Sequence, residues 1–353
     1  MEERPGNEDD TVVIRRMPAA VPVVRRSFLS AGLGSAAALL LAAGFGAFWW
    51  QRRAKLIPIG IATEAKIDQT QPCETIVTYL APDKSVVVID FPSLLSQGLT
   101  LDRVAAFVEK ADVPHNRVLD DAALRAAIAA SGDTISSYYY GHDYRAADLA
   151  RFFALAQSEK IVLNPQELWL KQLLHQLGWL QAGVNGAIIT LPAAGGVVSP
   201  EMREVILRHE ISHGAFYTVP KYRHYTEQFW ASLTPADRAA FTGFLGRQGY
   251  DTSLTELMLN ETQAYLIFTR DPRFFNAAAI GKTEAEVNQL RQGFIANMPD
   301  FWLTPLATEP LPPAPQSMPA CPAEQAILAV GRKRLCLCYH RGGMALTERS
   351  TIS

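Results

Sequence analysis

Hydrophobic positions recur along the middle of the chain with two different periods. Two runs rich in β-branched and aromatic residues, 75–80 and 86–91, flank a short stretch of turn-forming residues, which predicts a hairpin. A further short strand is predicted at Ala187–Leu191. Most other apolar residues recur at helical spacing. These helices are predicted over residues 101–110, 120–131 and 145–158, from 165 onward, and over 199–218, 234–246, 253–269 and 283–297.

Several of these helices carry clear start signals. Asn164 is a typical N-cap residue, Pro165 is a first-turn proline, and Glu167 stands at the acidic position of a capping box. Ser199 begins the next helix in a similar way, and Ser253 has capping-box spacing to Glu256. The pattern therefore predicts an α+β fold that is mostly helical with a small sheet.

A membrane-spanning segment is predicted near the N-terminus. Residues 27–50 form a run of 24 residues without a charge. As a helix this run would be about 36 Å long, against a hydrocarbon core of about 30 Å. Two tryptophans stand at its far end and three basic residues follow them, and four arginines precede the run. This favours a signal-anchor with residues 1–26 in the cytoplasm, although a signal peptide cleaved within Ala42–Ala47 is an alternative.

The start of this segment resembles a bacterial twin-arginine export signal. Arg25 and Arg26 precede Ser27, Phe28 and Leu29, which matches the order of residues in such signals. The alternative is that the arginines are positive-inside anchors of an ordinary signal-anchor helix. Both interpretations put residue 57 onward outside the cytoplasm, so the resemblance implies a single-pass protein of the bacterial inner membrane with a periplasmic body.

Composition divides the rest of the chain. Seven of the eighteen residues in 305–322 are prolines, which predicts an extended linker. The predicted parts are a cytoplasmic segment (1–26), the transmembrane helix (27–50), a folded body (57–304), the linker (305–322) and a tail (323–353). Within the body, we expect an N-terminal part at 57–160 and a metal-site part at 161–304.

Charge argues against a nucleic-acid partner. The chain has 33 Lys and Arg against 35 Asp and Glu, a net charge of −2. The first 56 residues carry eight basic and five acidic side chains, and residues 305–353 carry five and three, so the body is acidic. A protein that binds phosphates by charge neutralisation would show the opposite balance.

One motif indicates metal chemistry. His209, Glu210 and His213 form the pattern HExxH inside a predicted helix. Residues four apart lie on one helical face, so the two imidazoles can bind one metal ion while Glu210 stands beside its open coordination position. Zn²⁺ is the metal that such a site favours. The alternative is a surface helix whose polar residues face water.

A catalytic zinc site needs a third protein ligand. A third histidine at the spacing of HExxHxxGxxH is excluded because Phe216 and Val219 occupy the required positions. A carboxylate on a later helix remains, and Glu261 lies within the sequence Asn-Glu-Thr-Gln-Ala-Tyr in the middle of such a helix. Glu256 and Glu227 are the reserve candidates.

The HEISH helix followed by a helix bearing NETQAY resembles the gluzincin class of zinc metallopeptidases. The resemblance covers about seventy residues, from Ser199 to Arg270. It implies a zincin-like fold, with Zn²⁺ held by His209, His213 and Glu261, and with Glu210 as the general base. In such enzymes an edge strand before the HExxH helix pairs with the peptide substrate, which would make Ala187–Leu191 that strand.

An oxyanion-stabilising group is usual in this chemistry, and three candidates are present. Tyr217 and Tyr265 each lie four residues beyond a candidate ligand and thus on the metal-facing side of their helices. His224 is the third, provided that the segment after Pro220 is a loop that folds over the cleft.

The sequence thus predicts a membrane-anchored zinc-dependent metallopeptidase that acts on a peptide or protein. The alternatives are a non-catalytic envelope protein with a structural or vestigial zinc site, and a zinc hydrolase of a non-peptide amide or ester. Four cysteines, at positions 73, 321, 336 and 338, would meet an oxidising compartment after export, either as bridges from the tail to the body or as free thiols.

Overall fold

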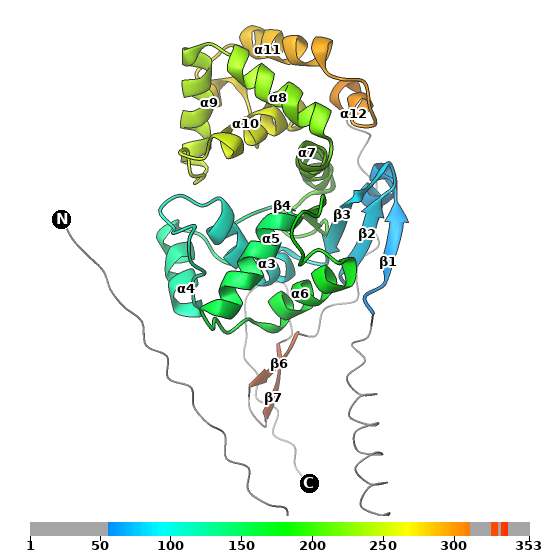
Figure 1. The fold of residues 1–353 in the computed structure, drawn as a ribbon, viewed down its shortest axis with the longest axis vertical. Coiled ribbons are helices and arrows are strands. Elements are labelled where there is room, and N and C mark those ends of the chain that lie inside the picture. The colour runs from blue at the N-terminus through cyan, green and yellow to red at the C-terminus, as the bar shows by residue number, and fades with distance from the viewer. Residues whose placement is uncertain (1–55, 311–325, 331–332, 338–353) are drawn as a thin grey trace, which may run out of the picture. The chain divides into compact units, whose positions relative to one another are not determined.

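The computed structural model describes residues 56–310 and the two strands Ala326–Val330 and Lys333–Leu337 (Figure 1). The expected transmembrane helix at 27–50 lies outside these residues, as do the segment 1–26 and most of the linker and tail. Across the part that the structure describes, no helix combines the length and the apolar character that crossing a bilayer requires.

The described chain is an α+β structure, as the sequence predicted, with one mixed five-stranded sheet and helices on both of its faces. Its strands are β1 (Ile59–Ala62), β2 (Ile76–Leu80), β3 (Asp83–Phe91), β4 (His142–Arg145) and β5 (Ala187–Pro192). Its α-helices are α2 (Glu64–Asp68), α3 (Leu94–Val108), α4 (Asp121–Ala130), α5 (Ala146–Ser158), α6 (Pro165–Leu177), α7 (Pro200–Thr218), α8 (Pro220–Ser232), α9 (Pro235–Arg247), α10 (Thr255–Gln263), α11 (Glu284–Asn297) and α12 (Thr304–Thr308).

The strand order of the sheet is β1-β2-β3-β5-β4. The predicted hairpin is confirmed, because β2 and β3 pair antiparallel. β3 and β5 are parallel, and β4 is antiparallel to β5. The predicted N-terminal part (57–160) and metal-site part (161–304) therefore contribute strands to a single sheet.

The expectation that Ala187–Leu191 is an edge strand is wrong. β5 lies between β3 and β4, so its backbone groups already pair on both sides. All six of its residues are buried, as expected for an interior strand. β4 is the edge strand at this side of the sheet.

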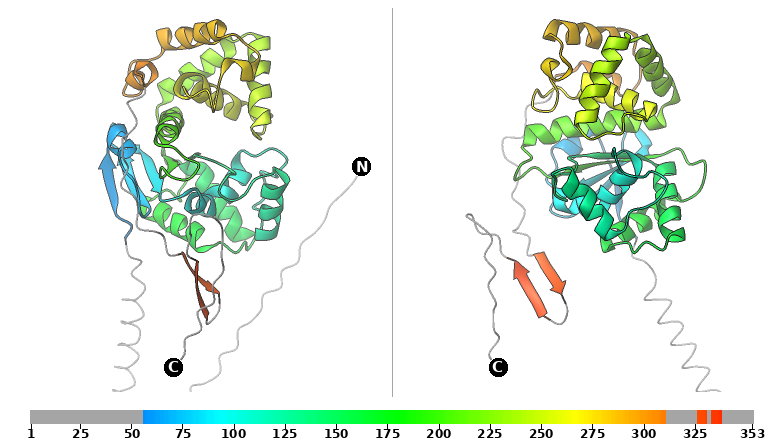
Figure 2. Two further views of the ribbon diagram at one scale, coloured as in Figure 1. Left: turned by 180° about the vertical axis from the view of Figure 1, so that it is seen from behind. Right: turned by 90° about the vertical axis from the view of Figure 1, so that its left-hand side faces the viewer.

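Alternate residues of β3 point to opposite faces of the sheet, and this divides the core in two. Val86 and Val88 pack with α7 and the helices that follow it, whereas Val87 and Ile89 pack with α3, α5 and α6. In Figure 1 and from behind in Figure 2, α3–α6 form one group of helices, α8–α12 form a second, and α7 passes between the second group and the sheet.

Helix α7 approaches the sheet closely at Gly214. A Cβ atom at this position would lie only 2.9 Å from Val86 Cγ1, so a larger residue would force the helix away from β3. Gly214 directly follows His213, whose side chain has no exposed surface. The close approach therefore fixes how deep the HEISH segment lies.

Three sequence predictions about the helices are wrong in detail. The segment after Pro220 is helix α8 and not a loop. The helix predicted at 253–269 begins after Leu254, without a side-chain cap from Ser253, and it changes to a π-helix at Ala264–Phe268. The first residues of the predicted linker form α12, where Ala307 is completely buried.

Cys73 is disulfide-bonded, which agrees with one of the two alternatives left open by the sequence. The other cysteines of the chain are Cys321, Cys336 and Cys338. In the tail, strands β6 (Ala326–Val330) and β7 (Lys333–Leu337) form an antiparallel pair that the sequence analysis did not predict.

A buried ion pair fixes the N-terminal part of α7 to the sheet. Both terminal nitrogens of Arg203 donate to the carboxylate of Asp90 on β3, at 2.8 and 2.7 Å. The same guanidinium also donates to the carbonyl oxygens of Pro192 and Ile67, at 2.7 and 2.9 Å. Arg203 is completely buried, so these bonds replace the hydration of its two terminal nitrogens and set the position of the helix that carries the HEISH motif.

We expect Arg203→Ala to lower the free energy of unfolding by about 3–5 kcal/mol, because it leaves the buried Asp90 carboxylate without its partner. Urea unfolding of the purified protein measures this change. Arg223→Ala is the matched control: it removes a partly exposed arginine with acidic partners and should cost about 1 kcal/mol or less. Equal losses in the two variants would show that the Arg203 pair does not hold α7.

Candidate metal centre

The two histidines of the HEISH segment converge on one point. Their Nε2 atoms lie 3.0 Å apart. The carboxylate of Glu261, on α10, has one oxygen 3.6 Å from His209 Nε2 and the other 3.6 Å from His213 Nε2. Ligand atoms around a tetrahedral zinc ion, about 2.0–2.2 Å from the metal, are separated by roughly 3.3–3.6 Å. The three side chains therefore have the spacing of a metal-ligand set.

The imidazoles are in the protonation state that a metal ion needs. Burial lowers the pKa of His209 to about 3. Burial also lowers the pKa of His213, to about 4, although the nearby Glu261 carboxylate acts in the opposite direction. Both rings are neutral at pH 7 and keep a lone pair for coordination.

A hydrogen bond on the far side of the His209 ring selects its tautomer. His209 Nδ1 lies 2.7 Å from Thr269 Oγ1, and that hydroxyl donates its only proton to the carbonyl oxygen of Ala264, at 3.1 Å. His209 must therefore donate from Nδ1, which leaves Nε2 unprotonated and directed toward His213 and Glu261.

The π-helix at Ala264–Phe268 explains why Thr269 is available for this contact. The backbone N–H of Thr269 bonds to the carbonyl oxygen of Ala264, five residues earlier. This wider turn changes the direction in which the residues after Glu261 point. Single π turns inside helices occur frequently at functional sites.

Glu210 lies beside the ligand set and is buried. Its Oε2 atom has no hydrogen-bond partner among the described residues. Burial and the carboxylates of Glu261 and Glu109 raise the pKa of Glu210 well above its ordinary value. A group with these properties takes up a proton readily, as a general base must.

Gly141 makes room for the Glu210 carboxylate. A Cβ atom at position 141 would lie 2.2 Å from Glu210 Oε1 and 2.7 Å from its carboxyl carbon. Gly141 directly precedes the edge strand β4, so the end of this strand and the carboxylate pack against each other.

A cavity of about 580 Å³ opens at His209 and Glu210. The segment Tyr138–Gly141 lines it, and so do Tyr250 and Tyr265. His213 and Glu261 do not line this cavity and lie deeper. A ligand in the cavity would therefore meet the metal position from the side of His209 and Glu210.

The structure separates the three candidates for oxyanion stabilisation. Tyr265 lines the cavity, and its ring packs against that of His209 with centroids 4.8 Å apart. Tyr217 lies behind the site, where its hydroxyl accepts a hydrogen bond from Asn260 and bonds to Asp143. His224 is exposed on α8, near Gln228 and Glu227, and it does not line the cavity.

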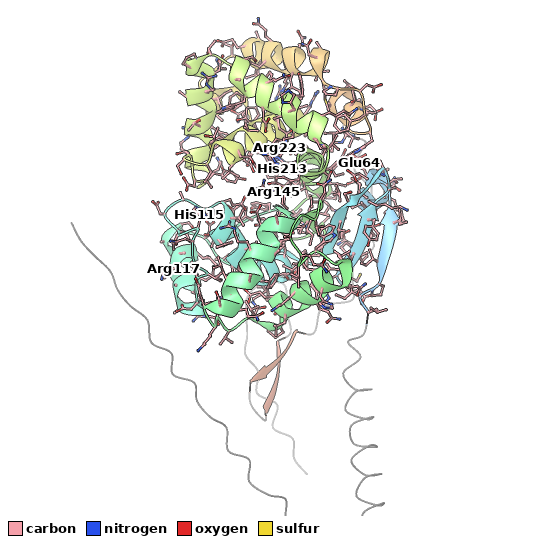
Figure 3. The ribbon with its side chains drawn as sticks, in the orientation of Figure 1. Glu64, His115, Arg117, Arg145, His213 and Arg223 are labelled. Atoms are coloured by element: carbon pink, nitrogen blue, oxygen red, sulfur yellow. The ribbon has the colours of Figure 1, made fainter. Side chains whose placement is uncertain are left out.

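The two reserve ligands lie elsewhere. Glu256 pairs with Arg145 at 2.6 Å and with Arg223 at 2.5 Å. Glu227 is a half-exposed partner of Arg223. Figure 3 labels both arginines and His213, and shows His213 close to where α7 crosses between the two groups of helices. Among the acids named from the sequence, Glu261 alone belongs to a ligand set with both histidines.

Two buried acids that the sequence analysis did not name also belong to the site. Asp143, on β4, has Oδ2 at 3.6 Å from His213 Nε2. Glu109, directly after α3, forms a close set with Asp143 and Glu261. Neither residue belongs to a motif, so only the pairing of β4 with β5 and the packing of α3 bring them to the site.

No protein-family model, curated protein or solved structure matches this chain.

We expect Thr269→Val to weaken zinc binding by about 10–100-fold, because it removes the hydroxyl that orients His209. Competition with a chromophoric chelator measures this affinity. Thr190→Val is the matched control, since Thr190 is also buried but its hydroxyl has no hydrogen-bond partner in the part of the chain that the structure describes. An unchanged affinity in the Thr269 variant would mean that this hydrogen bond does not prepare His209 as a ligand.

Proposed function

We propose that this protein is a zinc-dependent metallopeptidase. The observation that carries the proposal is the convergence of His209, His213 and Glu261 beside Glu210, which lines a cavity and whose Oε2 has no hydrogen-bond partner among the described residues. Two neutral imidazoles and one carboxylate are a usual ligand set of catalytic zinc, which keeps one position open for water. The gluzincin resemblance of the sequence implies the same ligand set.

The bound metal would supply an acidified water molecule and polarise the scissile carbonyl group. Glu210 has the role of general base: it accepts a proton from the attacking water and delivers it to the leaving amine. Its position against Gly141 keeps the carboxylate at the cavity and near His209. Tyr265 is the preferred donor to the oxyanion, because it is the one of the three candidates that lines the cavity.

The edge of the sheet supports a peptide as the substrate. Tyr138–Gly141 lines the cavity and leads directly into β4, whose outer edge is not paired with another strand of the sheet. An extended peptide lying along this segment would place its backbone near Glu210 and the metal. We infer that β4, and not β5, is the strand that guides the substrate.

We also propose that the body acts outside the cytoplasm, anchored by residues 27–50. The disulfide at Cys73 supports this location, since stable disulfides are typical of oxidising compartments.

We expect Glu210→Gln to retain one zinc ion at the histidine site and to lose hydrolysis by at least about 100-fold, because the base is removed while the ligands remain. Elemental analysis and cleavage of a quenched-fluorescent peptide library measure the two properties. His209→Ala and Glu261→Ala should each lose this zinc. Glu227→Gln, at an exposed acid, is the control and should change neither.

Other outcomes of this experiment would contradict the proposal. Zinc binding without hydrolysis in the wild-type protein, together with unfolding on chelation, would indicate a structural site. Hydrolysis of small esters or non-peptide amides but of no peptide would retain the metal chemistry and refute the substrate class. A folded protein that binds no zinc would refute the site itself.

We expect Gly141→Ala to lower peptide hydrolysis by at least about 10-fold with zinc content unchanged, because the added methyl displaces the Glu210 carboxylate from its position. The same library assay measures the loss. Gly293→Ala, on the outer part of α11 with no atom near the new methyl, is the matched control and should keep full activity. Wild-type activity in Gly141→Ala would show that the packing against Gly141 does not position the base.

A further inference from the structure

The cavity beside the candidate metal site also contains a lysine that takes no part in the proposed chemistry. Lys110 comes shortly after α3 and lines the same cavity as His209 and Glu210. Only 7% of its surface is exposed. Lysine side chains are rarely buried to this extent unless they are paired with an acid. The burial of Lys110 therefore requires an explanation.

Main-chain contacts fix the segment that carries this lysine. Lys110 forms an isolated antiparallel β-bridge with Tyr250. Next to it, the N–H of Ala111 donates to the carbonyl oxygen of Gly249 at 3.0 Å. These contacts join the chain after α3 to the connection between α9 and α10, so the backbone of Lys110 has a fixed position at the cavity.

Aromatic rings hold the ammonium group. Its Nζ lies 4.2 and 4.5 Å from the ring centroids of Tyr138 and Tyr139, which both line the cavity. A Cβ atom at Gly249 would lie 3.2 Å from Nζ, so the ammonium also packs closely against the backbone there. Aromatic faces attract a cation but accept no conventional hydrogen bond, so the N–H groups of the lysine remain available.

No acid is paired with this ammonium group. Among the described residues, none forms an ion pair or accepts a hydrogen bond from Lys110 Nζ. Burial lowers the pKa of the lysine, and three acids oppose this shift through their charge alone: Glu109, Asp133 and Asp102. Asp133 lines the cavity, but its carboxylate accepts hydrogen bonds from two serine hydroxyl groups instead. The lysine is thus a buried cation that would gain from an anionic partner.

Two arginines also line the cavity, and their guanidinium groups already have partners. Arg273 pairs with Asp271, and its Nε lies 2.8 Å from one carboxylate oxygen. Arg247 donates from both terminal nitrogens to backbone carbonyl oxygens, at 2.9 and 2.5 Å. Of these three basic side chains, only Lys110 has an unused donor group without any acceptor among the described residues.

From this arrangement we propose that Lys110 binds a carboxylate of the substrate and thereby selects the peptides that the site accepts. The carboxylate is either the C-terminus of the peptide or the side chain of an Asp or Glu residue, since these are the anions of an unmodified peptide. The inference rests on the proposed function, because it assigns another part of the same cavity to the substrate. At about 580 Å³, the cavity has the size of sites that hold small ligands.

The first test uses two matched pairs of peptide libraries, cleaved by the zinc-loaded full-length protein and analysed by mass spectrometry. One pair differs at the C-terminus, which is a free carboxylate or an amide. The other pair has amide C-termini and carries Glu or Gln. We expect kcat/KM to be at least about tenfold higher for the carboxylate member of one pair, because an ion pair forms away from water. The pair that shows this preference identifies the source of the carboxylate.

Lys110→Met removes the charge and keeps an unbranched side chain. It should reduce the preference to less than about twofold by lowering the cleavage of the carboxylate member. Equal losses for both members of the pair would show that Lys110 supports the fold and does not bind the substrate. Thermal melting verifies that the variant is folded.

A second measurement separates binding from hydrolysis. Isothermal titration calorimetry on Glu210→Gln, with the best-cleaved peptide and its neutral counterpart, should give Kd values that differ at least about tenfold. Adding Lys110→Met to this protein should remove the difference. A difference that persists in the double variant would overturn the assignment to Lys110.

Arg273→Gln is the matched control. Arg273 lines the same cavity, but its charge is already paired with Asp271. The variant should keep the preference for the carboxylate member. An equal loss of preference in this variant would assign the effect to the overall positive charge of the cavity and refute the specific role of Lys110.

The wild-type protein alone can also refute the inference. Peptide hydrolysis without a preference in either pair would refute the role of Lys110 and leave the proposed function intact. A protein that hydrolyses no member of the four libraries would refute both.

Discussion

The burial of α7 against the sheet is the constraint on which the rest of the structure depends. Of the charged residues on this helix, Arg203, Glu204, Arg208 and Glu210 are all buried. Each buried ionic group requires a partner or a shift of its pKa. The two terminal nitrogens of Arg203 donate to Asp90 and to two carbonyl groups, and Arg208 pairs with Glu64 at 2.9 Å. Glu204 Oε1 and Glu210 Oε2 have no hydrogen-bond partner among the described residues, and of these two acids only Glu210 lines the cavity.

The buried groups on α7 divide into those that hold the helix in place and those that belong to the candidate metal site. In the part of α7 before His209, the ion pairs of Arg203 with Asp90 and of Arg208 with Glu64 hold the helix against β3 and α2. The HEISH turn that follows has its polar atoms directed at one another and at the cavity instead. Native proteins leave buried polar groups unpaired chiefly where a ligand, a catalytic step or strain makes use of them. The ion pairs before His209 therefore hold α7 in place, and the Glu210 carboxylate lines the cavity with one oxygen unpaired among the described residues.

The sequence predicted those features of the fold that depend on local patterns. Period-2 and helical spacing, together with the caps at Asn164 and Ser199, placed most strands and helices, because local propensity and burial favour the same structure there. The position of β5 inside the sheet was not predictable, since a fully buried strand has the same apolar run at an edge as in the interior. The π turn was also missed, because no composition signal in the sequence marks it.

For the site, the motif and the downstream NETQAY segment identified His209, Glu210, His213 and Glu261, which the structure brings together. Helical spacing alone could not distinguish Tyr217 from Tyr265, because each lies four residues after a ligand. Only Tyr265 lines the cavity. Glu109, Gly141 and Asp143 come from parts of the chain far from the motif. Their proximity is a consequence of tertiary structure, so no local pattern could reveal it.

The opposite pKa shifts of the site residues follow from the same burial and define what the site can accept. Burial lowers the pKa of both histidines and raises that of Glu109 to about 8, so in each case the uncharged form is favoured. A neutral imidazole is already prepared for a metal ion, whereas a carboxyl group held neutral must first release its proton. Metal binding therefore has to displace protons from the carboxyl groups and not from the histidines. Near neutral pH, rising pH should strengthen binding through the acids, and only below the ordinary range of histidine titration would protonated imidazoles compete. Burial thus makes ionised carboxyl groups costly when no cation is bound. The same burial makes a bound cation favourable.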